Sequence, residues 1–211
     1  MNKSELEQFK KGKNQEQSKV IEYFTQDGCC AAWGIMKDDE YLQIVRNKRD
    51  SLKLREKALV KIGLDEDQVK EIPPVCLQGF RFDRAWAKKT AANRWVSSSY
   101  EVAWIFFSST QLYLYSMRFN LDEEKKSEST QEFFYKDVTA LTTMTRNYSS
   151  TDEEGKERVK TFGDNKIELE TTLFQITVPG EKLTVAMDAD EVPDREAVVQ
   201  AMKQKLREKK Q

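Results

Sequence analysis

Histidine is absent from the sequence, and this absence excludes more chemistry than any other feature of the composition. Without imidazole the chain has no Ser–His or Cys–His nucleophile pair, no histidine general base and no zinc site that needs a nitrogen ligand. Catalysis by carboxylates, lysine or tyrosine remains open. The sequence therefore favours a protein that is not an enzyme.

Cysteine is scarce, since the chain has only Cys29, Cys30 and Cys76. An odd number without regular spacing does not form a disulfide framework, and disulfides are rare in reducing compartments. We therefore expect reduced thiols in a cytoplasmic protein, with the side chains acting as small buried apolar groups.

Long apolar runs are also missing. The longest, at 102–107, is far shorter than the roughly 20 residues that a membrane-spanning helix needs. The segment 1–13 is polar and rich in lysine, without the apolar centre of a secretory signal. We expect neither a transmembrane segment nor secretion.

Motifs for cofactors and metals are missing as well. The sequence contains neither of the glycine patterns that cradle phosphates, G-x-x-x-x-G-K and G-x-G-x-x-G. The acidic residues Asp188, Asp190 and Glu191 lack the spacing of a calcium-binding loop. We expect no cofactor and no metal.

The charges nearly cancel: 35 lysines and arginines stand against 36 acidic residues. No global field draws the chain to nucleic acid, and no nucleic-acid motif is present, so no nucleic-acid partner is expected. The chain is nevertheless rich in aromatic residues, with 4 Trp, 7 Tyr and 11 Phe. Disordered chains are poor in these, so a folded domain with a heavily charged surface is predicted.

The first third of the chain, 1–72, has helical patterns. One helical segment is predicted at 4–24 with a break at Gly12, because glycine weakens a helix interior. A second is predicted at 38–62, kinked near 50–51 and ended by Gly63, which the prolines at 73–74 follow.

After these prolines the apolar pattern changes towards alternation, which predicts strands. The firmest prediction is a hairpin around Pro179 and Gly180, a strong turn pair. A change of phase within 166–178 predicts a bulge or a break near Thr172. The predicted strands lie at 75–82, 100–107, 112–119, 132–138, 141–148, 166–178 and 183–187.

A final helix is predicted from Pro193 onward, since Pro suits a first helical turn and lysines suit the last. About seven strands without βαβ alternation predict an antiparallel, partly closed barrel or a sandwich rather than a parallel sheet. The predicted fold is therefore α+β. It has a helical region at 1–72 and a β-domain with a capping C-terminal helix at 73–211.

Two neighbouring motifs, SSTQLYLYSMRF at 108–119 and FFYKDVTAL at 133–141, resemble bacterial pleckstrin-homology-like domains. In those domains a strand hairpin precedes a Tyr-x-Asp-Ile/Val-Thr strand. The residues that match this pattern are Tyr135, Asp137, Val138 and Thr139. The resemblance covers roughly 73–210 and implies a binding module without a cofactor, which recognises a lipid headgroup, a peptide or a protein.

The segment 81–94 is the candidate ligand site, because arginine grips phosphate oxygens as a fork and lysine adds charge. It connects the first two predicted strands, and the resemblance implies that this connection holds anionic headgroups where they bind. The candidate residues are Arg81, Arg84, Lys88, Lys89 and Arg94. The alternative interpretation is a solvated loop whose cations balance acidic residues elsewhere.

Carboxylate pairs are the remaining route to an enzyme. The acidic runs at 122–124 and 152–154 are predicted to be solvated loop tips, where burial does not raise a pKa. Three hypotheses follow: a scaffolding module that binds a protein partner or itself, a peripheral binder of anionic lipid or ligand through 81–94, and a histidine-free hydrolase. The aromatic strands are expected to bury one face against the helix at 38–62.

Overall fold

The computed structural model describes residues 3–25, 36–65, 67, 73–149, 159–160, 167–192 and 194–210. Cys29, Cys30 and the acidic run at 152–154 lie outside these residues. The helices are α1 (Lys3–Lys10), α2 (Gln15–Thr25), α3 (Asp38–Ser51), α4 (Leu54–Ile62) and α5 (Arg195–Lys210). The strands are β1 (Val75–Arg81), β2 (Ala87–Lys89), β3 (Trp95–Ser97), β4 (Ser99–Phe107), β5 (Gln111–Asn120), β6 (Lys126–Phe134), β7 (Ala140–Ser149), β8 (Glu168–Val178) and β9 (Glu181–Ala186).

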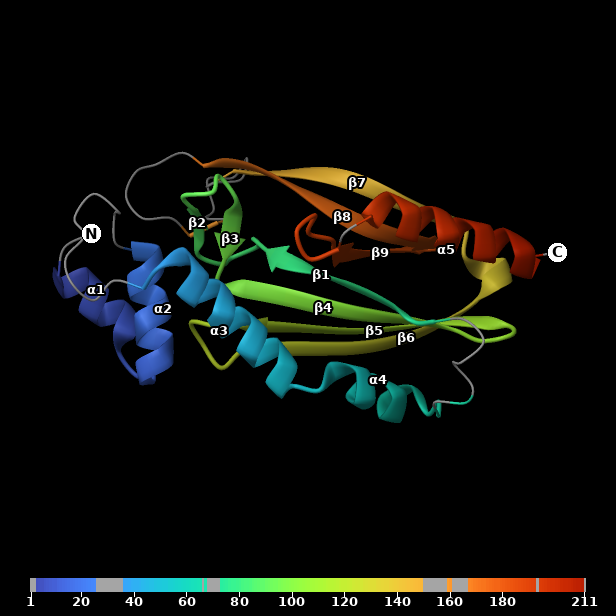
Figure 1. The fold of residues 1–211 in the computed structure, drawn as a ribbon, viewed down its shortest axis with the longest axis horizontal. Coiled ribbons are helices and arrows are strands. Elements are labelled where there is room, and N and C mark those ends of the chain that lie inside the picture. Colours follow the sequence, from blue (N-terminus) through green and yellow to red (C-terminus); the bar gives the residue numbers. More distant parts are fainter. Residues whose placement is uncertain are drawn as a thin grey trace.

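The described strands form three sheets, with orders β1-β4-β5-β6, β2-β3 and β7-β8-β9, and every ladder between named strands is antiparallel. In Figure 1 the helices α3 and α4 lie along the four-stranded sheet, whereas α5 lies beside the three-stranded sheet. The protein is therefore a mixed α+β fold with a C-terminal helix, as predicted.

The predicted partly closed barrel is wrong, because the described sheets do not join into a closed one. The chain leaves β6 through a 3-10 helix, η2 (Tyr135–Asp137), and enters the other sheet at Ala140, so β6 and β7 do not pair. Nine strands are present among the described residues where seven were predicted. The two additional strands form the β2–β3 hairpin, within the segment that was expected to be a basic loop.

The limits of the strands differ from the predictions in one other place. Strand β6 begins at Lys126, six residues before the strand predicted at 132–138, and the Tyr135 motif forms η2 rather than a strand. No alternation marked β6, because five successive residues from Lys126 are exposed on both faces. The bulge predicted near Thr172 is also absent, since β7 and β8 pair in one register from Ala140–Thr177 to Ser149–Glu168.

Glycines end and break the helices as predicted. Gly12 has a φ of 76° and separates α1 from α2, while Gly63 has a φ of 75° and forms the C-cap of α4. The kink predicted near 50–51 is the junction of α3 and α4, where Lys53 has a left-handed backbone. Gly180 has a φ of 84° in the turn between β8 and β9, which confirms this hairpin.

Strand β4 is buried on both faces, because each face meets a different core. Tyr100, Val102 and Phe106 lie in a core shared with the N-terminal helices. Ala103, Ile105 and Phe107 lie in a second core shared with β8, β9 and α5. This explains the strand's continuous run of aromatic and β-branched residues.

The helix α3 packs on the sheet through Tyr41, as expected for the residues at 38–62. Its ring stacks on Tyr23 at 4.5 Å between centroids, and its hydroxyl donates a hydrogen bond to the Ser97 carbonyl oxygen. The described part of the chain contains no helix that is long and apolar enough to cross a membrane.

Candidate functional site

The five predicted ligand residues of 81–94 do not converge on one site. Lys88 Nζ donates a hydrogen bond to the Tyr23 carbonyl oxygen at 3.1 Å and lies 4.5 Å from the centre of the Tyr23 ring. Lys89 lies 5.8 Å from the centre of the Trp95 ring. Strand β2 alternates its side chains, so these two lysines are held against different aromatic rings.

Arg81 is an internal cation at the end of β1. Its Nη1 lies 3.5 Å from Glu101 Oε2, and its Nη2 lies 3.9 Å from Asp83 Oδ2. Glu101 Oε2 also accepts a hydrogen bond from the Ala186 amide at 2.7 Å. The Arg81–Glu101 pair therefore joins β1 and β4 to the end of β9.

Arg94 is the centre of a half-buried ionic network. Its Nη2 donates a hydrogen bond to Asp188 Oδ2 at 2.8 Å and lies 3.5 Å from Glu191 Oε1, while its Nε lies 3.0 Å from Asp190 Oδ2. Burial lowers the pKa of Arg94, but its hydrogen bond to Asp188 and the nearby carboxylates outweigh this effect and raise the pKa. Arg49 of α3 joins the same network, 3.6 Å from Glu191.

This network explains the acidic residues that follow β9. The three carboxylates at 188, 190 and 191 surround Arg94 of the β2–β3 hairpin. Within the part of the chain that the structure describes, no group of three or more residues is arranged to hold a metal ion.

Arg84 lines a pocket of about 370 Å³ at one end of the four-stranded sheet. It lies in the turn after β1 with a left-handed φ of 56°, and its side chain is exposed. The other lining residues are Asp83, Arg118, Asn120, Lys125, Lys126 and Ser127. Four cationic side chains from three segments therefore surround one pocket.

Arg118 is the fixed member of this group. Its Nε donates a hydrogen bond to Ser99 Oγ at 2.8 Å, and its Nη2 donates one to the Asp83 carbonyl oxygen at 2.7 Å. Burial and the neighbouring Arg81 lower the pKa of Arg118, which means that its positive charge is incompletely compensated. A guanidinium group keeps its proton near neutral pH, so Arg118 is a fixed cation in the wall of the pocket.

Asp83 is the single carboxylate among the described lining residues, and other groups already engage it. Its Oδ2 accepts a hydrogen bond from the Tyr148 hydroxyl at 3.3 Å. Arg81 and Arg146 each lie 3.9 Å from one of its oxygens. The pocket consequently keeps an excess of positive charge.

One prediction about the acidic runs is wrong. Asp122 is 6% exposed, and burial raises the pKa of its carboxyl above the usual range. Its Oδ1 has no hydrogen-bond partner in the described structure. The adjacent loop residues hold it inside, because Gln17 of α2 donates a hydrogen bond to Glu124 at 3.0 Å and Lys13 lies 4.0 Å from Glu123.

Sequence reasoning missed three pocket residues, Arg118, Lys125 and Lys126. One signal was available. The predicted strands 100–107 and 112–119 form an antiparallel hairpin, so the loop that follows 119 lies at the end of the sheet where the strand 100–107 begins. The C-terminal end of β1 lies at that same end of the sheet, since Arg81 pairs with Ser99 and Ser99 pairs with Asn120. The strand order therefore brings 83–84 to 118–127.

Comparisons with protein-family models, with curated proteins and with solved structures find no match for this chain.

Proposed function

We propose that the chain is a non-catalytic binding module whose ligand presents an anionic group to the pocket of Arg84, Arg118, Lys125 and Lys126. One observation carries this proposal. Four cationic side chains line the pocket, while its lining carboxylate, Asp83, is already shared with Arg81 and Arg146.

The proposed ligand chemistry is that of a phosphate group. Arginine donates two parallel hydrogen bonds to phosphate oxygens, and lysine adds a mobile point charge. The pocket volume of about 370 Å³ lies in the range of small-molecule sites. The same chemistry is offered by a lipid headgroup and by a free phosphorylated molecule.

We further propose that 73–210 is a pleckstrin-homology-like unit. Apart from the inserted hairpin, a four-stranded sheet is followed by a three-stranded sheet and one helix. The final β8–β9 hairpin and the closing helix α5 are the features of this order that support the resemblance. Of the predicted basic segment, Arg84 supplies the pocket, and Arg81 supports it by engaging Asp83.

The test compares a double charge reversal in the pocket, R84E/K125E, with K182E/R207E. The four positions are all exposed, and Lys182 and Arg207 lie on β9 and α5. Each double variant is titrated with inorganic phosphate and floated with vesicles that contain or lack a phosphorylated anionic lipid.

The proposal predicts that the pocket variant loses at least about tenfold in affinity while the control variant keeps it, since each bond to a charged group contributes about 1.5–3 kcal/mol. Binding to vesicles alone identifies a lipid, and binding to phosphate identifies a free ligand. Equal binding by both variants would overturn the proposal.

A further inference from the structure

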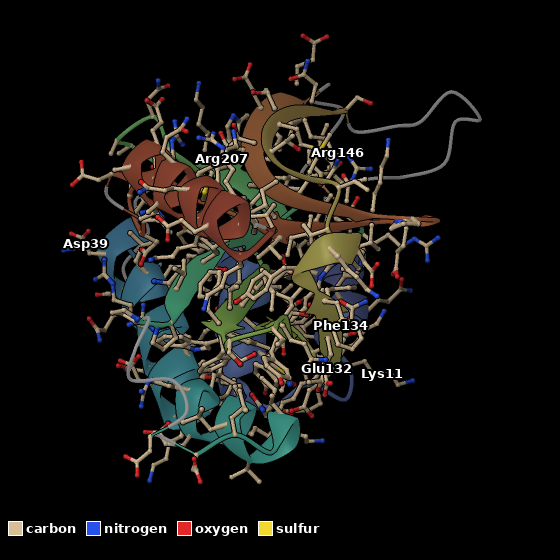
Figure 2. The ribbon with its side chains drawn as sticks, turned by 90° about the vertical axis from the view of Figure 1, so that its right-hand side faces the viewer. Lys11, Asp39, Glu132, Phe134, Arg146 and Arg207 are labelled. Carbon is tan, nitrogen blue, oxygen red and sulfur yellow. The ribbon has the colours of Figure 1, made fainter. Side chains whose placement is uncertain are left out.

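Strand β6 is a long edge strand, and no strand among the described residues pairs with its outer side. It runs from Lys126 to Phe134 and pairs with β5 alone, in one unbroken register. Most of its side chains are exposed, and Phe134 is 50% exposed. Figure 2 shows Glu132 and Phe134 near one another at the end of this strand.

The hydrogen bonds at both ends of β6 show which backbone groups face outward. The Tyr135 amide donates to the Thr110 carbonyl oxygen, and the Asn120 amide donates to the Lys125 carbonyl oxygen. Because bonded pairs alternate in an antiparallel ladder, the odd-numbered residues of β6 bond to β5. The even-numbered residues, from Lys126 to Phe134, direct their amide and carbonyl groups to the free edge.

The charges along this edge select one way of pairing it with itself. An antiparallel pair centred on Ser129 places Lys126 of each copy opposite Glu132 of the other. Centring on Glu128, Thr130 or Glu132 instead places a glutamate opposite a glutamate, which is unfavourable. Centring on Ser127 would also pair opposite charges, Lys126 with Glu128, but Lys57 and Lys61 of the same copy already hold Glu128. Centring on Gln131 pairs no charges of opposite sign. The register about Ser129 is therefore the most complementary one.

Glu128 does not oppose this arrangement. Its carboxylate lies 3.5 Å from both Lys57 and Lys61 of α4, and it accepts a hydrogen bond from the Tyr115 hydroxyl at 2.8 Å. These contacts lower the pKa of Glu128 against the opposing effect of its burial, so it stays ionised and neutralised within its own copy. In the favoured register it lies opposite Thr130.

We propose that the free edge of β6 binds a second copy of this chain, pairing antiparallel about Ser129. The two four-stranded sheets then form one continuous sheet across a two-fold axis. Seven residues from each copy, 126–132, take part. Such a small interface gives a weak dimer, populated between micromolar and millimolar concentration.

The backbone pattern supplies a selective variant. Thr130→Pro removes an amide that faces the free edge and leaves the ladder to β5 intact, whereas Thr130→Val keeps that amide. Sedimentation equilibrium is expected to show that dimerisation weakens at least about tenfold in T130P and is unchanged in T130V. Phosphate binding by T130P tests the anion pocket separately, because Thr130 does not line it.

Charge exchange provides a second test that does not depend on proline. K126E and E132K should each weaken self-association about tenfold, because both pairs then carry like charges. An equimolar mixture of the two variants, and the double variant K126E/E132K, restore opposite charges in every pair and should dimerise as the unaltered chain does. A chain that stays monomeric at millimolar concentration, or a dimer that ignores T130P and both reversals, would overturn the proposal.

Discussion

The hydroxyl of Tyr41 in α3 donates a hydrogen bond to the carbonyl oxygen of Ser97 in β3. Both residues are fully buried, and the bond fixes the N-terminal helices to the β2–β3 hairpin and the sheet. Burial raises the pKa of Tyr41 well above its usual range, with Tyr23 and Asp122 adding to the effect, so the hydroxyl is protonated and can donate at neutral pH.

Tyr41→Phe should destabilise the protein by about 1–2 kcal/mol, because it leaves a buried carbonyl without this donor. Urea denaturation measures the loss. The control is Tyr113→Phe, whose hydroxyl bonds only the half-buried Gln111 at 2.9 Å, and a change within about 0.5 kcal/mol is expected there. Equal effects in the two variants would show that Tyr41 does not join the helices to the sheet.

Alanine substitutions at Arg94 and Arg84 should affect different properties. The change at Arg94 should lower stability, and the change at Arg84 should weaken phosphate binding. Arg94→Ala removes the half-buried cation from Asp188 and Asp190 and leaves Glu191 with Arg49 alone, which should cost about 3 kcal/mol of unfolding free energy. Arg84→Ala alters an exposed side chain and should change the free energy of unfolding by less than about 0.5 kcal/mol.

Phosphate titration should rank the same two variants in the opposite order, with R84A weakened and R94A retained below its unfolding transition. If R94A is stable but binds phosphate poorly, Arg94 contributes to the ligand site, and its structural role is contradicted.

Asp122 gives the protein a specific pH dependence. Burial raises its pKa above the ordinary 3.8, while hydrogen bonds from its own backbone and from Ser98 oppose the shift only in part. The folded state therefore holds this proton more tightly than the unfolded state does, and Asp122 lowers stability as the pH rises from about 4 through its folded pKa. Below that range the penalty vanishes.

The variant Asp122→Asn should accordingly be more stable than the unaltered chain at neutral pH, with the difference shrinking as the pH falls to 4. Thermal denaturation across this range measures it. A stability difference that grows on acidification would show that Asp122 is favourably paired when ionised.

Cys76 should react slowly. It is a free, half-buried cysteine, and burial raises the pKa of its thiol to about 11. Because the thiolate is the nucleophile, alkylation at neutral pH should be about a hundredfold slower than for an unfolded cysteine. Peptide mapping after timed iodoacetamide treatment, with and without urea, measures the ratio, and equal rates would place Cys76 at the surface.

Short patterns in the sequence predicted the helix ends and the hairpin turn, because these depend on the backbone conformation of a few neighbouring residues. Gly12 and Gly63 mark helix ends because their backbones are left-handed, and Pro179–Gly180 specifies a hairpin by turn geometry alone. The first part of strand β6, from Lys126 to Gln131, escaped prediction because an edge strand exposed on both faces needs no alternation, and its pairing depends on the apolar strand β5.

The candidate site was predictable only in part, because it depends on long-range contacts. Arg84 was identified from its basic segment. Arg94 belongs to the same segment, but it pairs with carboxylates almost a hundred residues away in the sequence and does not line the pocket. In the sequence Asp122 looks like a solvated loop residue. Its burial depends on the contact between its loop and the helix α2, which the sequence pattern does not indicate. The sequence shows which residues are charged, whereas the fold determines which partner each charged residue contacts.

Amide chemical shifts recorded while inorganic phosphate is added test the anion pocket most directly. The pocket predicts that the largest changes fall on Asp83, Arg84 and the residues 118–127, and that they disappear in R84E/K125E. Changes centred on Lys88 and Lys89, or shifts of equal size in the charge-reversed chain, would contradict it.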